Sequence, residues 1–139
     1  MGTEKEKKLK LFVSVPMNGR TEEAIKNSIT KMHKMAELIL SEEFELIDSY
    51  IEGGDIRDGK QSIWYLGEAI KKLSEADYMI GLAEIENNSG CIIEREVALR
   101  YGIPYIRAFA EQVAPDIIMM MQAAQQNQQP NDISFEEIV

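Results

Sequence analysis

The chain contains only one cysteine, one histidine and four prolines among its 139 residues. A single cysteine, Cys91, cannot form an internal disulfide, and the lone histidine, His33, gives little basis for a zinc site or a catalytic triad. There is no GxGxxG or Walker-type glycine loop, which disfavours the usual binding of a dinucleotide or nucleoside triphosphate. We therefore expect neither a metal site nor a bound cofactor.

Positive charge and long apolar runs are also scarce. The 15 Lys and Arg against 24 Asp and Glu give a net charge of −9, which opposes binding to a nucleic acid polymer. No apolar run is long enough to cross a bilayer, and the charged residues 1–10 lack the apolar segment of a secretory signal. We expect a cytoplasmic protein that binds neither nucleic acid nor membrane. A small anionic ligand remains compatible with this charge.

The chain does contain a regular alternation of apolar strand-like and helix-like segments. The apolar runs predict strands at 9–15, 44–50, 78–83 and 105–110, and helical periodicity predicts helices at 22–41, 62–76 and 91–101. This alternation favours an α/β domain with a doubly wound, mostly parallel sheet of four to five strands, Rossmann-like or flavodoxin-like, with helices on both faces. The expected buried stripes of the first two helices are Ile25, Ile29, Met32, Ala36 and Ile39, and Ile63, Leu66, Ile70 and Leu73.

The last part of the chain departs from this alternation. Pro115 predicts the start of a methionine-rich helix over 117–124, before a glutamine-rich stretch. We assign 1–110 to the α/β domain and 111–139 to a C-terminal helical extension that serves oligomerisation or completes an active site. The helix is apolar over most of its circumference, which either a subunit interface or packing on the same chain would explain. We expect a homo-oligomer.

The most informative carboxylate is Glu94. In open parallel sheets, ligands bind beyond the carboxyl ends of strands where the strand order reverses, here between the first and third strands. The loop after the third strand leads into a helix whose first turn is expected to carry Glu94, where free N–H groups and the helix dipole stabilise an anion. Glu96 points away and has Arg100 one turn later. Glu94 is therefore the candidate nucleophile, with a purely stabilising helix charge as the alternative.

Other chemically active side chains have two interpretations each. Asp77 either ties the second helix to the third strand or takes part in catalysis, and Glu68 either lies on a solvated helix face or reaches the cleft. His33 is expected to face solvent. Cys91 heads the third helix, but a small buried hydrophobe is favoured over a reactive thiol.

Several motifs, taken in order, resemble the nucleoside 2-deoxyribosyltransferase-like superfamily, which includes deoxynucleoside monophosphate N-glycosidases. The segment Phe12-Val13-Ser14-Val15-Pro16-Met17-Asn18-Gly19 is similar to the aromatic, small and Pro-Met-x-Gly opening of that superfamily. The Ala76-Asp77 strand start, Ser89-Gly90, Glu94, Ala98 and Gly102-Ile103-Pro104 follow in the same order. The resemblance covers about residues 9–110.

The resemblance implies cleavage of the N-glycosidic bond of a nucleoside or a nucleoside 5′-monophosphate. Glu94 would attack the anomeric carbon, the base would leave, and water or another base would resolve the glycosyl-enzyme. Asn18, the Gly19 backbone and Arg20 would hold the sugar and any phosphate, and Ser89 at the helix N-terminus would complete the anion site. The implied binding residues are Phe12, Ser14, Pro16, Met17, Asn18, Gly19, Arg20, Asn88, Ser89 and Gly90, with Asp77 and Glu68 as further catalytic candidates.

Three positions depart from the pattern of that superfamily. Asn88 stands where transferases commonly have an acidic residue that contacts the deoxyribose. An expected Asp that handles the nucleobase proton falls near Ala69, so that Glu68 is a shifted substitute, and Val15 replaces a glycine. These departures favour hydrolysis over transfer. They leave two other interpretations open: a catalytically inactive module that binds a nucleotide-like metabolite, and a structural or interaction protein.

Overall fold

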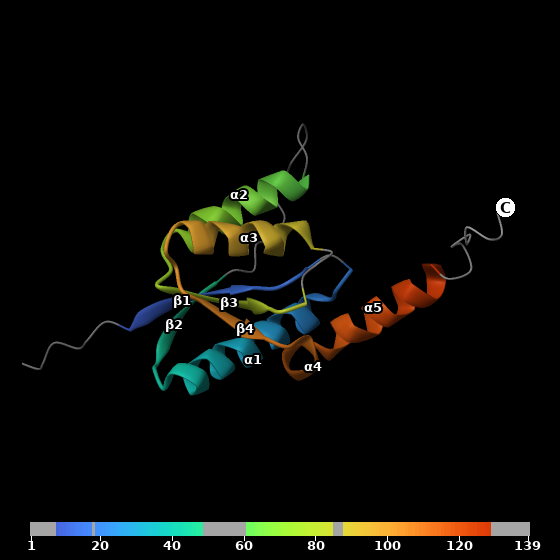
Figure 1. The fold of residues 1–139 in the computed structure, drawn as a ribbon, viewed down its shortest axis with the longest axis horizontal. Coiled ribbons are helices and arrows are strands. Elements are labelled where there is room, and N and C mark those ends of the chain that lie inside the picture. The colour runs from blue at the N-terminus through green and yellow to red at the C-terminus, as the bar shows by residue number, and fades with distance from the viewer. Residues whose placement is uncertain (1–7, 18, 49–60, 85–87, 129–139) are drawn as a thin grey trace, which may run out of the picture.

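The computed structural model describes residues 8–17, 19–48, 61–84 and 88–128, the last five of these by backbone only. The four strands it describes form one parallel sheet in the order β2-β1-β3-β4 (Figure 1). The predicted doubly wound α/β fold is therefore confirmed. In chain order the elements are β1 (Leu9–Ser14), α1 (Glu22–Leu40), β2 (Phe44–Ile47), α2 (Gln61–Leu73), β3 (Tyr78–Leu82), α3 (Ser89–Arg100), β4 (Tyr105–Ala108), α4 (Ala110–Val113) and α5 (Pro115–Gln128).

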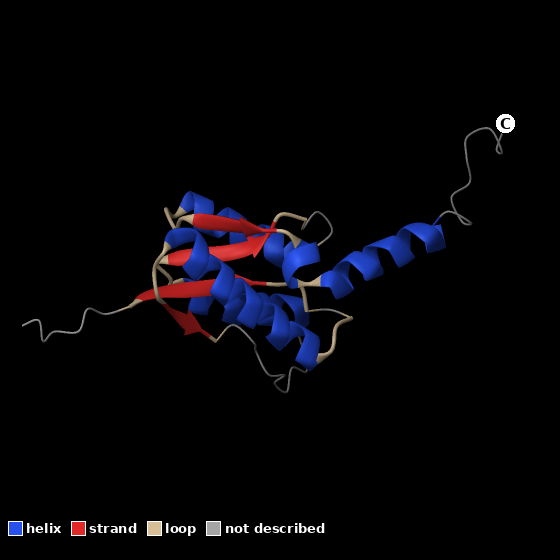
Figure 2. Cartoon of the chain, turned by 90° about the horizontal axis from the view of Figure 1, so that it is seen from below, coloured by secondary structure: helices blue, strands red, loops and turns tan. Residues whose placement is uncertain are grey.

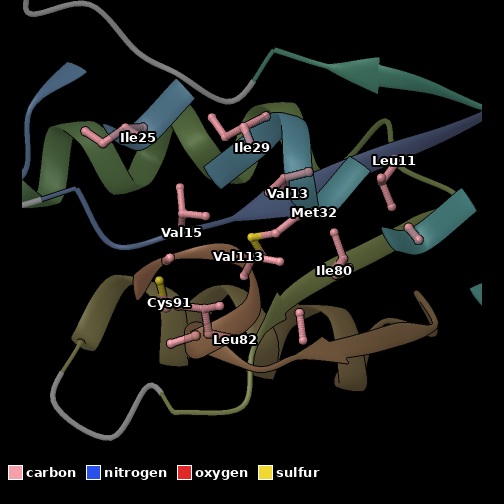
Figure 3. Packing of buried hydrophobic residues seen from close by; sticks show 14 of the residues in the cluster. Leu11, Val13, Val15, Ile25, Ile29, Met32, Ile80, Leu82, Cys91 and Val113 are labelled. Carbon is pink, nitrogen blue, oxygen red and sulfur yellow. The ribbon is translucent and has the colours of Figure 1, made fainter. Parts of the chain in front are cut away.

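Helices cover both faces of this sheet. Figure 1 shows α2 and α3 on one face, and α1 and α4 on the other. Side chains of β1 alternate between these layers, so that Leu11 and Val13 pack with α1 while Phe12 packs with α2 and α3. Figure 3 shows the larger of the two cores, where side chains of β1, β3, α1 and α4 meet. Because both faces are buried, the strands read as continuous apolar runs.

The first helix follows its sequence pattern except at its end. Thr21 caps α1 as predicted, since its Oγ1 accepts a hydrogen bond of 3.0 Å from the N–H of Ala24. Ile25 and three further residues of the predicted stripe are buried. The prediction that Ile39 is buried is wrong, because this residue is 53% exposed. The 19 residues of α1 span about 28 Å, whereas the six residues of β1 span about 20 Å. The helix α1 is therefore longer than the strand against which it packs.

The C-terminal helix begins where Pro115 predicts but runs to Gln128, beyond the expected end at 124. Glutamine is a good helix former, so the glutamine-rich stretch continues the helix. Ile117 is buried in the larger core, whereas Met119, Met120 and Met121 are among the exposed large hydrophobic side chains. Figure 2 shows α5 leaving the body of the domain. No helix in the described ranges is long and apolar enough to cross a membrane.

Candidate active site

The order of the strands places the topological switch point between β1 and β3, as predicted. From β1 the chain passes to β2 on one side, and α2 then returns it to β3 on the other side. A cavity of about 740 Å³ lies there, at the carboxyl end of β1 and the start of α3. Its volume is in the range of pockets that hold small ligands.

Four segments of the described chain line this cavity. They are the end of β1 with the loop that follows it, the first turns of α1, the part of α2 from Ser62 to Ala69, and the first two turns of α3. The described lining residues are Phe12, Val13, Val15, Met17, Arg20, Glu22, Ile25, Ser62, Ile63, Tyr65, Leu66, Ala69, Asn88, Ser89, Gly90, Cys91, Ile93 and Glu94.

The wall contributed by α2 was not predicted. Ile63 was expected in a buried stripe, but its side chain is 65% exposed, and it lines the cavity together with Tyr65 and Leu66. The sequence carries a signal for this wall. Ile63-Trp64-Tyr65-Leu66 are four consecutive apolar residues, more than one buried stripe of a helix can use. The cavity thus has an apolar and aromatic side.

Glu94 lies in the cavity wall, but not in the helical turn that the sequence suggested. Since α3 begins at Ser89 and is capped by Asn88, Glu94 falls in its second turn, beyond the free N–H groups. The first-turn prediction is therefore wrong. The side chain is buried, with 9% of the residue exposed, and burial raises the pKa of its carboxyl from 4.5 to about 7. By contrast, Glu96 is half exposed and accepts a 2.8 Å hydrogen bond from Arg100, as predicted.

Ser14 holds this carboxyl. It is the last residue of β1 and is only 2% exposed, and its Oγ donates a hydrogen bond of 2.5 Å to Oε1 of Glu94. This bond lowers the pKa of Glu94, although burial has the larger effect. Within the described part of the chain, Glu94 has no ion pair with a basic side chain. The carboxylate therefore combines burial, one donor and access to the cavity.

Cys91 and Tyr105 lie close to this pair. Cys91 is buried, as predicted for a small hydrophobe, and burial raises the pKa of its thiol to about 12, so the thiol is protonated at neutral pH. Burial also raises the pKa of Tyr105 to about 12. The Tyr105 ring packs over Gly81, whose lack of a side chain leaves room for the ring. Gly81 is the partner of Ser14 in the β1–β3 register.

The charge of Arg20 is neutralised by Asp116 and is not available to a ligand in the cavity. The Arg20 side chain has no exposed surface, and its Nε and Nη2 donate hydrogen bonds of 2.7 and 2.9 Å to the two carboxylate oxygens of Asp116 in α5. It also donates to the carbonyls of Pro16 and Ala24 and to the Ser28 hydroxyl. Arg20 thus joins the β1–α1 loop to α1 and α5. The expected role of Arg20 in holding a phosphate does not fit this geometry, because the guanidinium is already paired with Asp116, 96 residues away.

The start of α3 reaches the cavity as the resemblance implies. Asn88, Ser89 and Gly90 all line the wall. Asn88 also has a structural role, because its side-chain oxygen accepts a 2.8 Å hydrogen bond from the N–H of Cys91 and so caps the helix. In general, the N-terminus of a helix favours an anion.

Two of the candidate catalytic carboxylates are not brought to the cavity. Asp77 lies at the amino end of β3, where its Oδ2 accepts a 2.8 Å hydrogen bond from the N–H of Lys10 and so ties β3 to β1. Glu68 accepts a 3.0 Å hydrogen bond from Lys71 instead of facing the cavity. Both positions agree with the structural interpretation of these residues.

The remaining predicted residues are distributed around the β1–α1 loop. Met17 lines the cavity, whereas Pro16 contributes a carbonyl to Arg20. Asn18 lies outside the described residues. Gly19 is exposed with a φ of +76°, a conformation that favours glycine. His33, which was expected to face solvent, is half-buried, with Nε2 2.9 Å from the carbonyl oxygen of Phe44.

The described residues contain no group of three or more His, Cys, Asp or Glu side chains that could hold a metal ion. Taken together, the fold and the site define an α/β protein with a cavity at the switch point of a parallel sheet and a buried carboxylate in the wall of that cavity. No family model, curated protein or solved structure matches the chain.

Proposed function

We propose that this protein cleaves the N-glycosidic bond of a nucleoside or nucleoside 5′-monophosphate, with Glu94 as the nucleophile. The observation that carries the proposal is the setting of Glu94. Its carboxyl is buried in the wall of a cavity at the switch point, bonded by Ser14, and unpaired with any cation in the described residues. Such a carboxylate can stabilise the oxocarbenium-like transition state and then bond to the sugar.

In the proposed reaction, a Glu94 oxygen attacks the anomeric carbon while the bond from that carbon to the base nitrogen breaks. The electron pair leaves with the base, which takes a proton from solvent. Water then adds to the anomeric carbon, releases the Glu94 carboxylate and gives up its second proton to solvent. The sum is one nucleoside and one water converted to free base and free sugar, with retention at the anomeric carbon.

The pKa of Glu94 sets the pH at which this chemistry works. Only the ionised carboxylate attacks, and burial raises the pKa of this group to about 7. The rate is therefore expected to rise with pH through 7 and to level off above it. Burial also removes water from around the carboxylate, which makes it a better nucleophile once it is ionised.

The charges of the lining favour an uncharged nucleoside over its monophosphate. Arg20 is paired with Asp116, and Glu22 adds a negative charge to the wall. The N-terminus of α3 works in the other direction, but a helix dipole contributes only about 0.3 to 1 kcal/mol. The apolar side formed by Ile63, Tyr65 and Leu66 suits the faces of a nucleobase.

A second function, binding without turnover, is favoured by one observation. At the place expected for an acid that handles the base proton, Ala69 lines the cavity, and the neighbouring Glu68 is turned to Lys71. A cavity without that acid could hold a nucleotide-like metabolite and leave its glycosidic bond intact.

One experiment tests both functions. The protein is incubated with matched nucleosides and 5′-monophosphates, and free base is measured by chromatography. We expect release from nucleosides, and at least a 10³-fold loss of kcat/KM in Glu94→Gln, because a neutral amide cannot serve as the nucleophile. Glu96→Gln, on the exposed side of the same helix, is the matched control and should keep its activity. Undiminished release by Glu94→Gln would exclude the nucleophile role, whereas ligand-induced thermal stabilisation without release would favour binding alone.

The proposal includes a cytoplasmic homo-oligomer. Three exposed methionines of α5, Met119, Met120 and Met121, are the surface that would bind a second copy. Light scattering of Met119→Lys against wild type tests this part separately.

A further inference from the structure

The hydroxyl of Ser14 lies where it can control how Glu94 is used. Ser14 ends β1, pairs with Gly81 of β3, and points to the face covered by α2 and α3. Its Oγ donates to Oε1 of Glu94 at 2.5 Å. Across the described chain, Oε2 of Glu94 receives no hydrogen bond. The two carboxylate oxygens are therefore inequivalent.

We propose that Ser14 is a positioning residue for Glu94, holding Oε1 so that Oε2 is the oxygen that meets the ligand. This inference rests on the proposed glycosidic function and deepens it. It also changes the role of Ser14, which the sequence placed among the substrate-binding residues.

Ser14 does not itself reach the ligand. It is 2% exposed and is absent from the cavity lining, whereas Glu94 is part of that lining. A hydroxyl can donate one hydrogen bond, and Ser14 donates its hydrogen bond to Glu94. Ser14 is thus neither a nucleophile nor a sugar ligand in this geometry, and it acts through the carboxylate.

The position of Glu94 in α3 makes such a partner necessary. In the second turn of the helix, the backbone N–H groups are used within the helix, so none is free to orient the carboxylate. A glutamate side chain has several rotatable bonds, and burial alone favours its protonated form. The Ser14 hydroxyl restricts these rotations and favours the ionised form, which is the form that attacks.

Two titratable groups close to Glu94 keep the same charge between pH 5 and pH 9. Cys91 on α3 and Tyr105 on β4 both have a pKa raised to about 12 by burial, so they remain protonated. The cations of this region are the guanidinium groups of Arg20, Arg95 and Arg107. Glu22, across the cavity, is exposed and salt-bridged to Lys26. A titration near neutral pH therefore belongs to neither Cys91 nor Tyr105.

The test compares Ser14→Ala with Ser28→Ala in the full chain. Ser28 is a matched control, because it is also 2% exposed and also bonds a charged side chain, that of Arg20. Glu94 is titrated by NMR in protein labelled with ¹³C at the glutamate carboxyl, its signal assigned by its disappearance in Glu94→Gln. Loss of a hydrogen bond to a charged group is expected to raise the Glu94 midpoint by about 1 to 2 pH units in Ser14→Ala and not at all in Ser28→Ala.

The pH profile of kcat/KM provides the second readout. In Ser14→Ala the rising limb should move to higher pH by the same amount as the NMR midpoint, with activity partly regained above it. Ser14→Cys, which keeps a weaker donor of similar size, should lie between wild type and alanine and guards against a folding defect of Ser14→Ala. A purely structural role would lower activity at every pH without moving the limb, and that result would overturn the proposal.

The two proposals fail in distinguishable ways. An unchanged Glu94 midpoint in both Ser14 variants overturns the positioning role, whatever the activity. A midpoint that shifts as expected, in a protein that releases no base from any nucleoside, overturns the glycosidic function while the control of Glu94 by Ser14 stands.

Discussion

Replacing Glu94 with glutamine should change stability in a way that depends on pH, and the sign of the change is informative. The folded protein raises the pKa of this carboxyl from 4.5 to about 7, chiefly by burial. Between these values the folded state holds a proton that the unfolded state has lost. Stability therefore falls as pH rises through this window, and the loss is complete above pH 7.

The size of this effect follows from the two pKa values. Each pH unit between them corresponds to about 1.4 kcal/mol, so the raised pKa makes folding less favourable by about 3 kcal/mol at pH 8, where folded Glu94 is ionised, and by about 1 kcal/mol at pH 5, where folded Glu94 still holds its proton. Glutamine has the same shape, stays neutral at every pH, and can still accept a hydrogen bond from Ser14. Glu94→Gln should therefore be more stable than wild type by about these amounts.

Urea denaturation at pH 5, 6, 7 and 8, followed through circular dichroism, measures the difference directly. All other titrating groups are shared by the two proteins, so their effects cancel in the difference. Glu96→Gln is the control, because it makes the same substitution on the exposed side of the same helix. If the glutamine variant instead became relatively less stable as pH rose, the carboxylate would be stabilised by the helix N-terminus, and the reasoning from burial would be refuted.

Two further predictions concern the framework of the cavity. Asp116→Ala should lower the free energy of unfolding by about 1 to 3 kcal/mol, since it removes the partner of the Arg20 guanidinium, which is fully buried. Urea melts should show a smaller loss for Asp116→Asn and almost none for Glu96→Ala, and equal losses in all three would contradict this view. Gly81→Ala should cost about 1 to 3 kcal/mol, because a Cβ there would overlap the Tyr105 hydroxyl and lie 3.1 Å from two ring carbons. Gly67→Ala in α2, where a Cβ meets nothing within 4 Å, should be neutral or stabilising in the same assay, and a harmless Gly81→Ala would argue against the packing of Tyr105.

Much of the framework could be predicted from local patterns. The two-sided apolar runs identified the strands, Thr21 and Pro115 marked helix starts, and the order of elements located the switch point between β1 and β3. Helical periodicity also predicted that Glu94 faces the interior and Glu96 faces solvent. These features depend on residues a few positions apart, whose preferences act before any tertiary contact forms.

The errors in the site share a different cause. The sequence pattern predicts the start of α3 two residues too late, which puts Glu94 in the first turn and implies an anion stabilised by free amides. Arg20 was assigned to a ligand because no local pattern reveals Asp116, which lies 96 residues away. The apolar wall formed by α2 was also missed, because Ile63 and Leu66 belong to the helical stripe that the pattern predicts to be buried.

The sequence alone determined the four strands, every described helix except α4, and which carboxylate faces the interior, because these follow from the periodicity of the backbone. Only the tertiary structure decided the electrical character of the site. It buried Glu94 against β1 beside a single hydroxyl, and it neutralised Arg20 with a carboxylate from α5. Desolvation and ion pairing act through space, so their sign and size depend on which distant segments pack together.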